Sequence, residues 1–409
     1  MKTKVWYPYQ QMQNQNAFPI LESAKGVKLK LEDGRELIDG ISSWWCTIHG
    51  YSHEELNQTI EAQIKKVSHF MLGGITNKPA ENLAKKLIEI TPKGLEHIFL
   101  SDSGSVGIEV ALKMAIQYHH NKGQDKRHII SLKKAYHGDT FKAMEVGDDP
   151  CYHGAFNQLF ENRSYILPPY CNDIDRAIND LQEIISSKSD IAAFIVEPLL
   201  QGAGGFRLYP AEFLNRAYKI CQQHDILMIF DEVATGFGRT GTLFAANQCD
   251  FTPDIMVLSK ALTAGYVGHA ATIATSAVFE AFYGKTESNA LMHGPTFSGN
   301  PLACSVALKS IEIFERENYL EKIKRIHAIL LHRFSSISSE KIKDIRIIGA
   351  CAAIEVHDSA YLEGFKEFAI ENGTWLRPFE EFVYIMPAYI ISEAELNKLI
   401  DVISKWFTN

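Results

Sequence analysis

The sequence lacks several features that identify whole classes of protein. In its 409 residues no apolar run approaches the length of a membrane span, and the longest runs, such as 191–196, have the length of a strand. No apolar segment follows the lysines near the amino terminus, so a secretory signal is not expected and the predicted location is cytoplasmic. The formal net charge is −8, without a basic excess or stripe, which argues against a nucleic-acid partner.

Cysteine is scarce and irregularly spaced. Seven cysteines are present and no two are separated by two residues. The odd number and the scattered positions favour free thiols over a disulfide framework. A zinc site built from Cys46, Cys151 and nearby histidines stays open as an alternative, but the usual ligand spacing is missing and no metal is predicted.

The composition is that of a globular protein with a large core. Hydrophobic residues make up 46% and charged residues 22% of the chain, and no repeat or low-complexity tract is present. A chain of this length is expected to form two or three domains.

The order of apolar patterns predicts an α/β fold. Helical spacing is found at 54–67, 80–90, 106–119 and 212–224, and strand-sized apolar runs at 97–100, 127–132, 191–196, 226–230 and 255–258. Because these runs are almost continuously apolar, we expect strands buried on both faces, in a mostly parallel sheet between helices.

The two ends of the chain have a different pattern. Short strands are predicted in 27–45, around a turn at 32–35, and again in 345–356 and 383–386. Long helical stretches occupy 302–317, 320–334 and 393–407. We therefore predict a large domain at 50–300 and a smaller α+β domain built from 1–49 together with 301–409.

Two predicted strands are followed by chemically useful residues. In open α/β sheets ligands lie outside the carboxyl ends of the strands. Asp231 follows one strand and could hold a protonated pyridine nitrogen, although an aspartate there could also cap the next turn. Lys260 follows another and, in an apolar cleft, would have a lowered pKa and could form a Schiff base with an aldehyde, although most lysines are surface groups.

Two further segments extend this pattern. Ser103, Gly104 and Ser105 precede a helix, so they could hold a phosphate or only cap the helix. Tyr136 follows another strand and could stack on a flat cofactor or pack at a domain surface. The glycine-spaced loop 236–241 is interpreted as a tight turn near the site, because no strand–loop–helix unit surrounds it as a dinucleotide site requires.

Together these segments resemble the class III aminotransferases, a branch of the fold-type-I pyridoxal phosphate enzymes. The matching segments are SGS (103–105), YHG (136–138), EP (197–198), DEVATGFGR (231–239), SK (259–260) and GPTF (294–297). The resemblance implies a fold-type-I transferase with pyridoxal 5′-phosphate as cofactor.

A narrower resemblance covers nearly the whole chain. It is similar to the branch of this family that aminates 8-amino-7-oxononanoate to 7,8-diaminononanoate in biotin biosynthesis. The segments that carry it are WYPY (6–9), DGISSWW (39–45), IHGY (48–51), GGIT (73–76), QGAGG (201–205), MHGPTF (292–297) and WLRPF (375–379). The implied amino donor is S-adenosyl-L-methionine; lysine as donor, or another ω-amino acid or diamine transamination, stays open.

The resemblance also implies roles for individual residues. Lys260 binds the cofactor and shuttles the proton, Asp231 pairs with the ring nitrogen, Val233 packs under the ring and Tyr136 stacks above it. The phosphate is held by Gly104 and Ser105, with Pro295 and Thr296 from a second subunit, so a homodimer with shared active sites is expected.

For the substrate, the resemblance implies that Arg377 binds the carboxylate. Trp44 and Trp45 line the pocket for its aliphatic chain, Tyr9 and Tyr384 complete its recognition, Gly294 lies along the channel, and Asp139 and Arg239 are polar supports. Alternatives stay open: Trp45 as core packing only, Tyr384 facing away, Arg239 serving an ion pair in its loop, and Trp375 packing without contact. Residues 266–269 are expected near the donor end of the pocket.

Overall fold

A seven-stranded sheet lies at the centre of the computed structural model, which describes residues 4–14, 18–148, 150–161, 163–169 and 173–408. Its strands are β4 (Leu95–Ser101), β5 (His128–Leu132), β6 (Arg163–Ile166), β7 (Ile191–Val196), β10 (Leu227–Asp231), β11 (Ile255–Leu258) and β12 (Ala270–Thr275). They are ordered β4-β12-β11-β10-β7-β5-β6. Only β12 runs antiparallel to its neighbours, so the expected mostly parallel sheet is confirmed.

Both faces of this sheet are buried, as the apolar runs predicted. Along β7, Ala193 and Ile195 pack into one core cluster, whereas Phe194 and Val196 pack into the other. Successive side chains of a strand point to opposite faces, so each strand contributes to both clusters. Burial on both faces is typical of parallel sheets covered by helices.

Helices surround the sheet. They are α2 (Glu54–Ile64), α3 (Lys78–Ile90), α4 (Gly104–Asn121), α5 (Phe141–Val146), α6 (Pro150–His153), α7 (Ile174–Ser187), α8 (Ala211–Gln223), α9 (Ser276–Glu280) and α10 (Pro301–Arg316). The two longest, α4 and α10, begin at side-chain caps. Ser103 accepts the N–H of Val106 at the start of α4, and Asn300 accepts the N–H of Ala303 at the start of α10, where Pro301 is the first helical residue. Ser103 therefore caps α4, which engages the N–H of Val106 and leaves those of Gly104 and Ser105 without a hydrogen-bond partner among the described residues.

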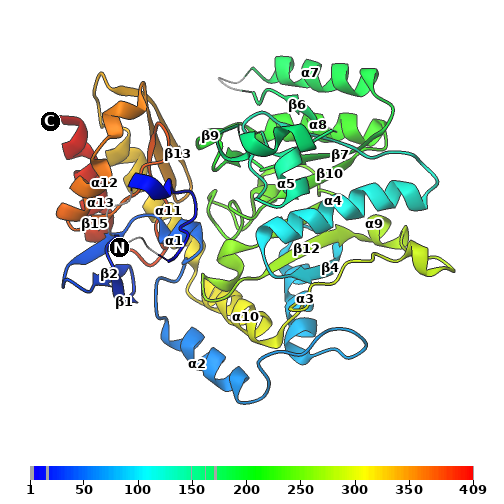
Figure 1. The fold of residues 1–409 in the computed structure, drawn as a ribbon, viewed down its shortest axis with the longest axis horizontal. Coiled ribbons are helices and arrows are strands. Elements are labelled where there is room, and N and C mark those ends of the chain that lie inside the picture. The colour runs from blue at the N-terminus through cyan, green and yellow to red at the C-terminus, as the bar shows by residue number, and fades with distance from the viewer. Residues whose placement is uncertain (1–3, 15–17, 149, 162, 170–172, 409) are drawn as a thin grey trace.

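The two chain ends lie together on the left of Figure 1. One sheet has the order β1-β2-β3-β15, formed by β1 (Leu21–Lys25), β2 (Lys28–Leu31), β3 (Glu36–Asp39) and β15 (Thr374–Trp375). A second has the order β13-β14-β16, formed by β13 (Ile342–Ile348), β14 (Cys351–Val356) and β16 (Phe382–Ile385). The helices α11 (Tyr319–Ile329), α12 (Phe365–Glu371) and α13 (Glu393–Thr408) belong to the same part. Because β15 pairs with β3, we propose that residues 1–49 and 301–409 form one domain beside the domain at 50–300, with α10 packed against α2 and α3 of the larger domain.

The structure corrects the sequence analysis at one place and adds to it at others. The prediction of strands throughout 27–45 is wrong beyond Asp39, because Ser42–Trp45 (α1) forms a turn of left-handed backbone. Strands β6 and β12 and helix α7 were not predicted. Of the helices in the described residues, none combines the length and apolar character that crossing a membrane requires.

Candidate active site

Five segments meet at one edge of the central sheet. The loops that follow β4, β5, β7, β10 and β11 bring together Ser105, Tyr136, Glu197, Asp231 and Lys260. These five strands all run in the same direction and place their carboxyl ends at the same edge, where ligands of such sheets are bound.

Two adjoining cavities open there. The inner one, of 170 Å³, is lined by Trp45, Ser103, Gly104, Ser105, Tyr136, His137, Gly138, Glu197, Ala203, Asp231, Val233, Ala234, Ser259 and Lys260. The outer one, of 400 Å³, is lined by Pro8, Tyr9, Trp44, Trp45, Tyr136, Asp139, Tyr152, Ala203, Phe206, Lys260, Arg377, Pro378, Phe379 and Tyr384. Because Lys260 borders both, a group held by it in the inner cavity faces the outer one.

Lys260 stands directly after β11, on left-handed backbone with φ 43°, where the short helix η5 (Lys260–Thr263) begins. Its Nζ lies 4.0 Å from the centroid of the Trp45 ring. Burial lowers the pKa of Lys260 to about 8, against the opposing attraction of Asp231 and Glu197. A lysine with a lowered pKa is more often a neutral amine near pH 7, the form that attacks an aldehyde.

Asp231 ends β10 and is held by two donors. Its Oδ2 lies 2.7 Å from Nδ1 of His137, and its Oδ1 accepts the N–H of Val233 at 3.1 Å. A buried carboxylate needs such partners. His137 had no role in the sequence analysis, since the pairing joins the ends of two strands far apart in the chain.

Glu197 is a further buried carboxylate, after β7. It accepts the backbone N–H of Tyr136 and that of Gly202, and burial raises its pKa to about 7. Its segment was noted only through the family resemblance. Glu197 fixes the position of the Tyr136 backbone beside the inner cavity.

The first turn of α4 also lines the inner cavity. A Cβ at Gly104 would lie 3.0 Å from Cγ1 of Val233, and one at Gly138 would lie 2.1 Å from Oγ of Ser105. Glycine is required at Gly138 also because its φ is 121°. Backbone N–H groups at the start of an 18-residue helix face this space, which is the usual environment of a bound phosphate.

A hydroxyl network lines the outer cavity. The hydroxyls of Tyr9 and Tyr136 lie 3.0 Å apart, and each donates to Asp139, at 2.5 Å and 3.0 Å respectively. Nε2 of His153 lies 3.5 Å from Asp139, and this imidazole contributes most to lowering the pKa of that carboxyl. The network places a negative charge beside two hydroxyl groups at the mouth of the site.

Aromatic rings form the rest of the outer wall. The guanidinium carbon of Arg377 lies 5.2 Å from the Trp44 ring centroid, and within the described residues Arg377 has no ion-pair partner. Trp45 meets Tyr384 edge to face at 6.3 Å. Trp45 and Tyr384 therefore both face the cavity, although Trp45 also packs in the core with 9% of its surface exposed.

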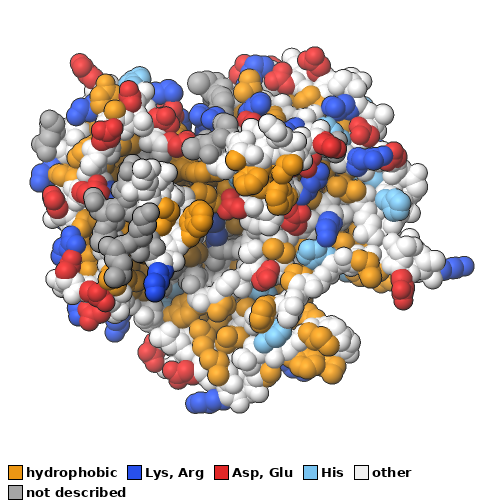
Figure 2. Space-filling view, in the orientation of Figure 1, with side chains coloured by type: hydrophobic (Ala, Val, Ile, Leu, Met, Phe, Trp, Pro, Cys, Tyr) orange, Lys and Arg blue, Asp and Glu red, His pale blue; other side chains and the backbone are white. Residues whose placement is uncertain are grey.

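Three predicted residues lie elsewhere in this chain. Gly294, Pro295 and Thr296 line a separate cavity of 600 Å³ together with Met71 and Leu72, and not the cavities beside Lys260. Apolar side chains are exposed around them: Met292 is 77% and Phe297 53% exposed. Apolar residues gather on this lower face of the molecule (Figure 2).

Arg239 and residues 266–269 also lie outside both cavities. Arg239 is fully buried and donates from Nη1 to the carbonyls of Ala350 and Pro387, so the alternative of an ion pair in its loop is wrong within the described residues. Tyr266 donates to Asn57 instead of reaching the site. Trp375 packs in the core without lining either cavity, as the packing alternative expected.

The cysteines give no support to the zinc alternative. Cys46 is a free thiol whose Sγ lies 3.0 Å from the carbonyl of Ser43, and the side chain of Cys151 lies outside the described part.

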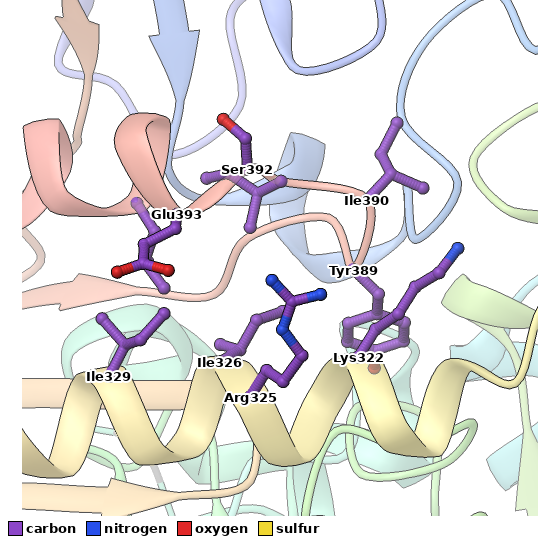
Figure 3. A pocket seen from close by; sticks show the side chains of 10 residues that line it. Lys322, Arg325, Ile326, Ile329, Tyr389, Ile390, Ser392 and Glu393 are labelled. Atoms are coloured by element: carbon purple, nitrogen blue, oxygen red, sulfur yellow. The ribbon is translucent and has the colours of Figure 1, made fainter.

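A fourth cavity lies between α11 and the start of α13 (Figure 3). It measures 290 Å³, and Lys322, Arg325 and Glu393 line it beside several isoleucines. It shares no residue with the cavities around Lys260 and holds no comparable set of chemical groups.

Known proteins resemble this chain over nearly its full length. The family model described as aminotransferase class-III matches residues 9–407. The adenosylmethionine-8-amino-7-oxononanoate aminotransferase of Buchnera aphidicola subsp. Schizaphis graminum is 42% identical, over 99% of this chain and 95% of that protein. The crystal structure of adenosylmethionine-8-amino-7-oxononanoate aminotransferase from Methanocaldococcus jannaschii has a TM-score of 0.95 at 34% identity, covering 99% of this chain and 97% of that chain. An amine transaminase from an uncultivated Pseudomonas species, solved in a PLP-bound form, has a TM-score of 0.95 at 27% identity, covering 100% and 99%.

Proposed function

The chain belongs to the class III aminotransferase family, and we propose that it aminates 8-amino-7-oxononanoate to 7,8-diaminononanoate, a step of biotin biosynthesis. Membership confirms the family resemblance and the fold-type-I architecture expected from the sequence. The specific substrate is supported by relatives and a solved structure that carry the name of this reaction. The observation that carries it in the molecule is Arg377, which has no ion-pair partner among the described residues and lies at the end of an aromatic wall in the outer cavity.

The proposed cofactor is pyridoxal 5′-phosphate, which when bound supplies a ring that accepts electrons from the substrate carbon. Three sides of the inner cavity carry groups suited to this cofactor. Lys260 would bind its aldehyde, Asp231 its ring nitrogen, and the first turn of α4 its phosphate. Val233 and Tyr136 border the space for the two faces of the ring. A Cβ at Gly104 or Gly138 would press against Val233 or Ser105, which both line this cavity, so glycine at these positions preserves its shape.

Lys260 is proposed to act as both base and acid. Its lowered pKa allows Nζ to take a proton from the substrate carbon and return it near neutral pH. Asp231, itself held by His137, would keep the ring nitrogen protonated. Trp45 covers Nζ on one side and keeps water from it.

The outer cavity suits a long substrate with a carboxylate at one end. A guanidinium fork binds a carboxylate through two parallel hydrogen bonds, which is the role proposed for Arg377. Trp44, Trp45 and Tyr384 offer apolar contact for the aliphatic chain, and Tyr9 offers a hydroxyl beside that of Tyr136. S-adenosyl-L-methionine is the proposed donor, with lysine as the alternative. The same cavity could accept a donor unlike the keto substrate, because stacking surfaces do not require a fixed hydrogen-bond pattern.

We propose a homodimer in which the active site is shared. The exposed apolar face around Met292 and Phe297 adjoins the segment that holds Gly294, Pro295 and Thr296. Large exposed apolar patches mark interaction surfaces. In a two-fold dimer this segment would complete the phosphate site of the partner.

The test is an assay of 8-amino-7-oxononanoate run in parallel with S-adenosyl-L-methionine and with lysine. We expect 7,8-diaminononanoate with one of these donors and no product without a donor. Absence of product with every donor, while another ω-amino acid or diamine reacts, would reject the proposed substrate. Product from a single substrate without a donor would instead indicate an aminomutase.

A further inference from the structure

The two tryptophans of the substrate cavity stand on unusual backbone. Ser42, Ser43, Trp44 and Trp45 have φ values of 48°, 49°, 59° and 77°, one after another. None of them is glycine, and for other residues the left-handed conformation places Cβ too close to the following carbonyl oxygen. Four such residues in succession need support from their surroundings.

The carboxylate of Asp39 is the nearest support. Its Oδ1 accepts the N–H of Ile41 at 2.8 Å, and its Oδ2 accepts the N–H of Ser43 at 3.2 Å and the hydroxyl of Tyr51 at 2.6 Å. Asp39 is only 2% exposed, so this carboxylate is directed inward and engaged by three donors. Tyr51 is fixed in turn, because it exchanges backbone hydrogen bonds with Gly26.

A second anchor joins the turn to the other end of the chain. Ser42 donates from Oγ to the carbonyl of Met386, and the N–H of Met386 donates to the carbonyl of Gly40. Met386 follows directly after β16, the strand that carries Tyr384. The turn is therefore fixed to the strand that supplies another wall of the same cavity.

The left-handed turn determines where the two indoles lie. Trp44 reaches outward to Tyr9 and Arg377, with ring contacts of 6.0 Å and 5.2 Å. Trp45 reaches inward beneath Lys260 and against Gly202, where a Cβ would lie 2.9 Å from the indole. A right-handed turn would send these neighbouring side chains in other directions.

We propose that Asp39 and Tyr51, which touch neither cavity, are positioning residues that hold the left-handed turn and thereby set the indoles of Trp44 and Trp45 for substrate binding. The proposal rests on the proposed function for its kinetic part only. The Asp39–Tyr51 pair acts through the two indoles, chiefly on the fit of the substrate, and affects Lys260 only through Trp45. Its loss therefore raises KM more than it lowers kcat.

The test uses Tyr51→Phe, which removes one hydroxyl and no ring. The control is Tyr266→Phe, since that hydroxyl bonds Asn57 and lines neither cavity. We expect KM for 8-amino-7-oxononanoate to rise about tenfold, the effect of one lost hydrogen bond to a charged group, with kcat changed less than twofold. Tyr266→Phe leaves both constants unchanged.

Rescue separates positioning from general damage. In the Tyr51→Phe background, Ser43→Gly removes the Cβ penalty of the left-handed backbone, whereas Ser43→Ala removes the same hydroxyl and keeps the penalty. We expect Ser43→Gly to recover part of the KM change and Ser43→Ala to recover none. Equal recovery by both, or unchanged KM in Tyr51→Phe, would overturn the proposal.

A measurement that needs no substrate tests the proposal separately from the assigned reaction. Acrylamide quenching of tryptophan fluorescence is measured on the protein in a Trp6→Phe background, because Trp6 is far more exposed than Trp44. We expect Tyr51→Phe to increase quenching and Ser43→Gly to reverse part of that increase. If the wild-type protein does not turn over 8-amino-7-oxononanoate but these quenching changes occur, the proposed function fails and the positioning role stands; identical quenching in Tyr51→Phe and the parent overturns the role.

Discussion

Nζ of Lys260 lies 4.0 Å from the centre of the Trp45 ring, so Lys260 and the aromatic wall of the outer cavity are in direct contact. Burial lowers the pKa of this lysine to about 8, and the indole provides part of that burial. Through this contact, the position of Trp45 in the outer cavity affects the pKa of Lys260 in the inner cavity.

The first prediction concerns the titration of Lys260. In the cofactor-free protein, labelling of Lys260 by trinitrobenzenesulfonate, followed by peptide mass spectrometry, should increase with a midpoint near pH 8. Trp45→Ala admits water and should move the midpoint upward, whereas Trp375→Phe, outside both cavities, should leave it in place. A wild-type midpoint near 10.5, the ordinary lysine value, would contradict the account.

The same pKa gives a stability prediction with a definite sign. Between pH 8 and 10.5 unfolded chains keep the Lys260 proton that the folded protein has lost, so the contribution of this group to the free energy of unfolding rises with pH. Thermal melts of the cofactor-free protein should show this rise, and Lys260→Met should remove it. An unchanged pH dependence in that variant would show that other groups cause the trend.

Asp231→Asn should lower kcat by on the order of 100-fold or more, because a neutral amide no longer stabilises a protonated ring nitrogen. The matched control is Asp254→Asn. Asp254 is partly buried just before the neighbouring strand β11, at the opposite end from the site, where an amide oxygen can still accept the N–H of Met228. Steady-state kinetics of both variants give the loss in kcat that is compared. Equal losses would mean that burial of a carboxylate, and not its place at the site, determines activity.

Arg377→Ala should raise KM for the keto substrate by roughly 10- to 100-fold, the loss of charge-assisted hydrogen bonds to a carboxylate. Arg377→Lys keeps the charge but loses the planar fork, so an intermediate KM is expected. An analogue of the substrate without its carboxylate should bind wild-type and Arg377→Ala protein equally. If the analogue distinguished the two proteins, Arg377 would act on another part of the substrate.

Met292→Asp should prevent dimer formation and weaken cofactor retention, because it places a charge in the exposed apolar face beside Pro295 and Thr296. Leu331→Asp, in the exposed part of η7 (Leu330–Phe334), is the control and should remain dimeric. Analytical ultracentrifugation gives the mass, and absorbance after dialysis gives the bound cofactor. A monomeric wild-type protein that retains full activity would reject the shared site.

Local patterns predicted the central sheet well. The strands at 191–196 and 255–258 are continuous apolar runs, and burial on both faces requires such runs. Strand β12 was missed because Ala270–Thr275 is built from small residues, and its place depends on pairing with β4 and β11. Strand β6 was missed because Arg163–Ile166 is short and only partly apolar, as expected at the edge of a sheet.

In the candidate site too, local sequence patterns predicted some residues, whereas contacts between distant residues could not be predicted. Lys260 and Asp231 were identified because each follows an apolar run, and the structure brings both to the inner cavity. The pairing of His137 with Asp231 joins residues 94 positions apart, and no local pattern reports such a contact. The left-handed turn that carries Trp44 and Trp45 could not be predicted either, since its support comes from Tyr51 and Met386.

The central claim is that Lys260 carries the cofactor, and covalent trapping tests it most directly. The purified protein is incubated with pyridoxal 5′-phosphate, reduced with borohydride and digested, and the pyridoxyl group is located by peptide mass spectrometry. The account predicts the group on the peptide that contains Lys260 in the wild-type protein, with no labelled peptide at this site and no catalytic cycling in Lys260→Ala. Trapping on a different lysine, or turnover that survives Lys260→Ala, would contradict it.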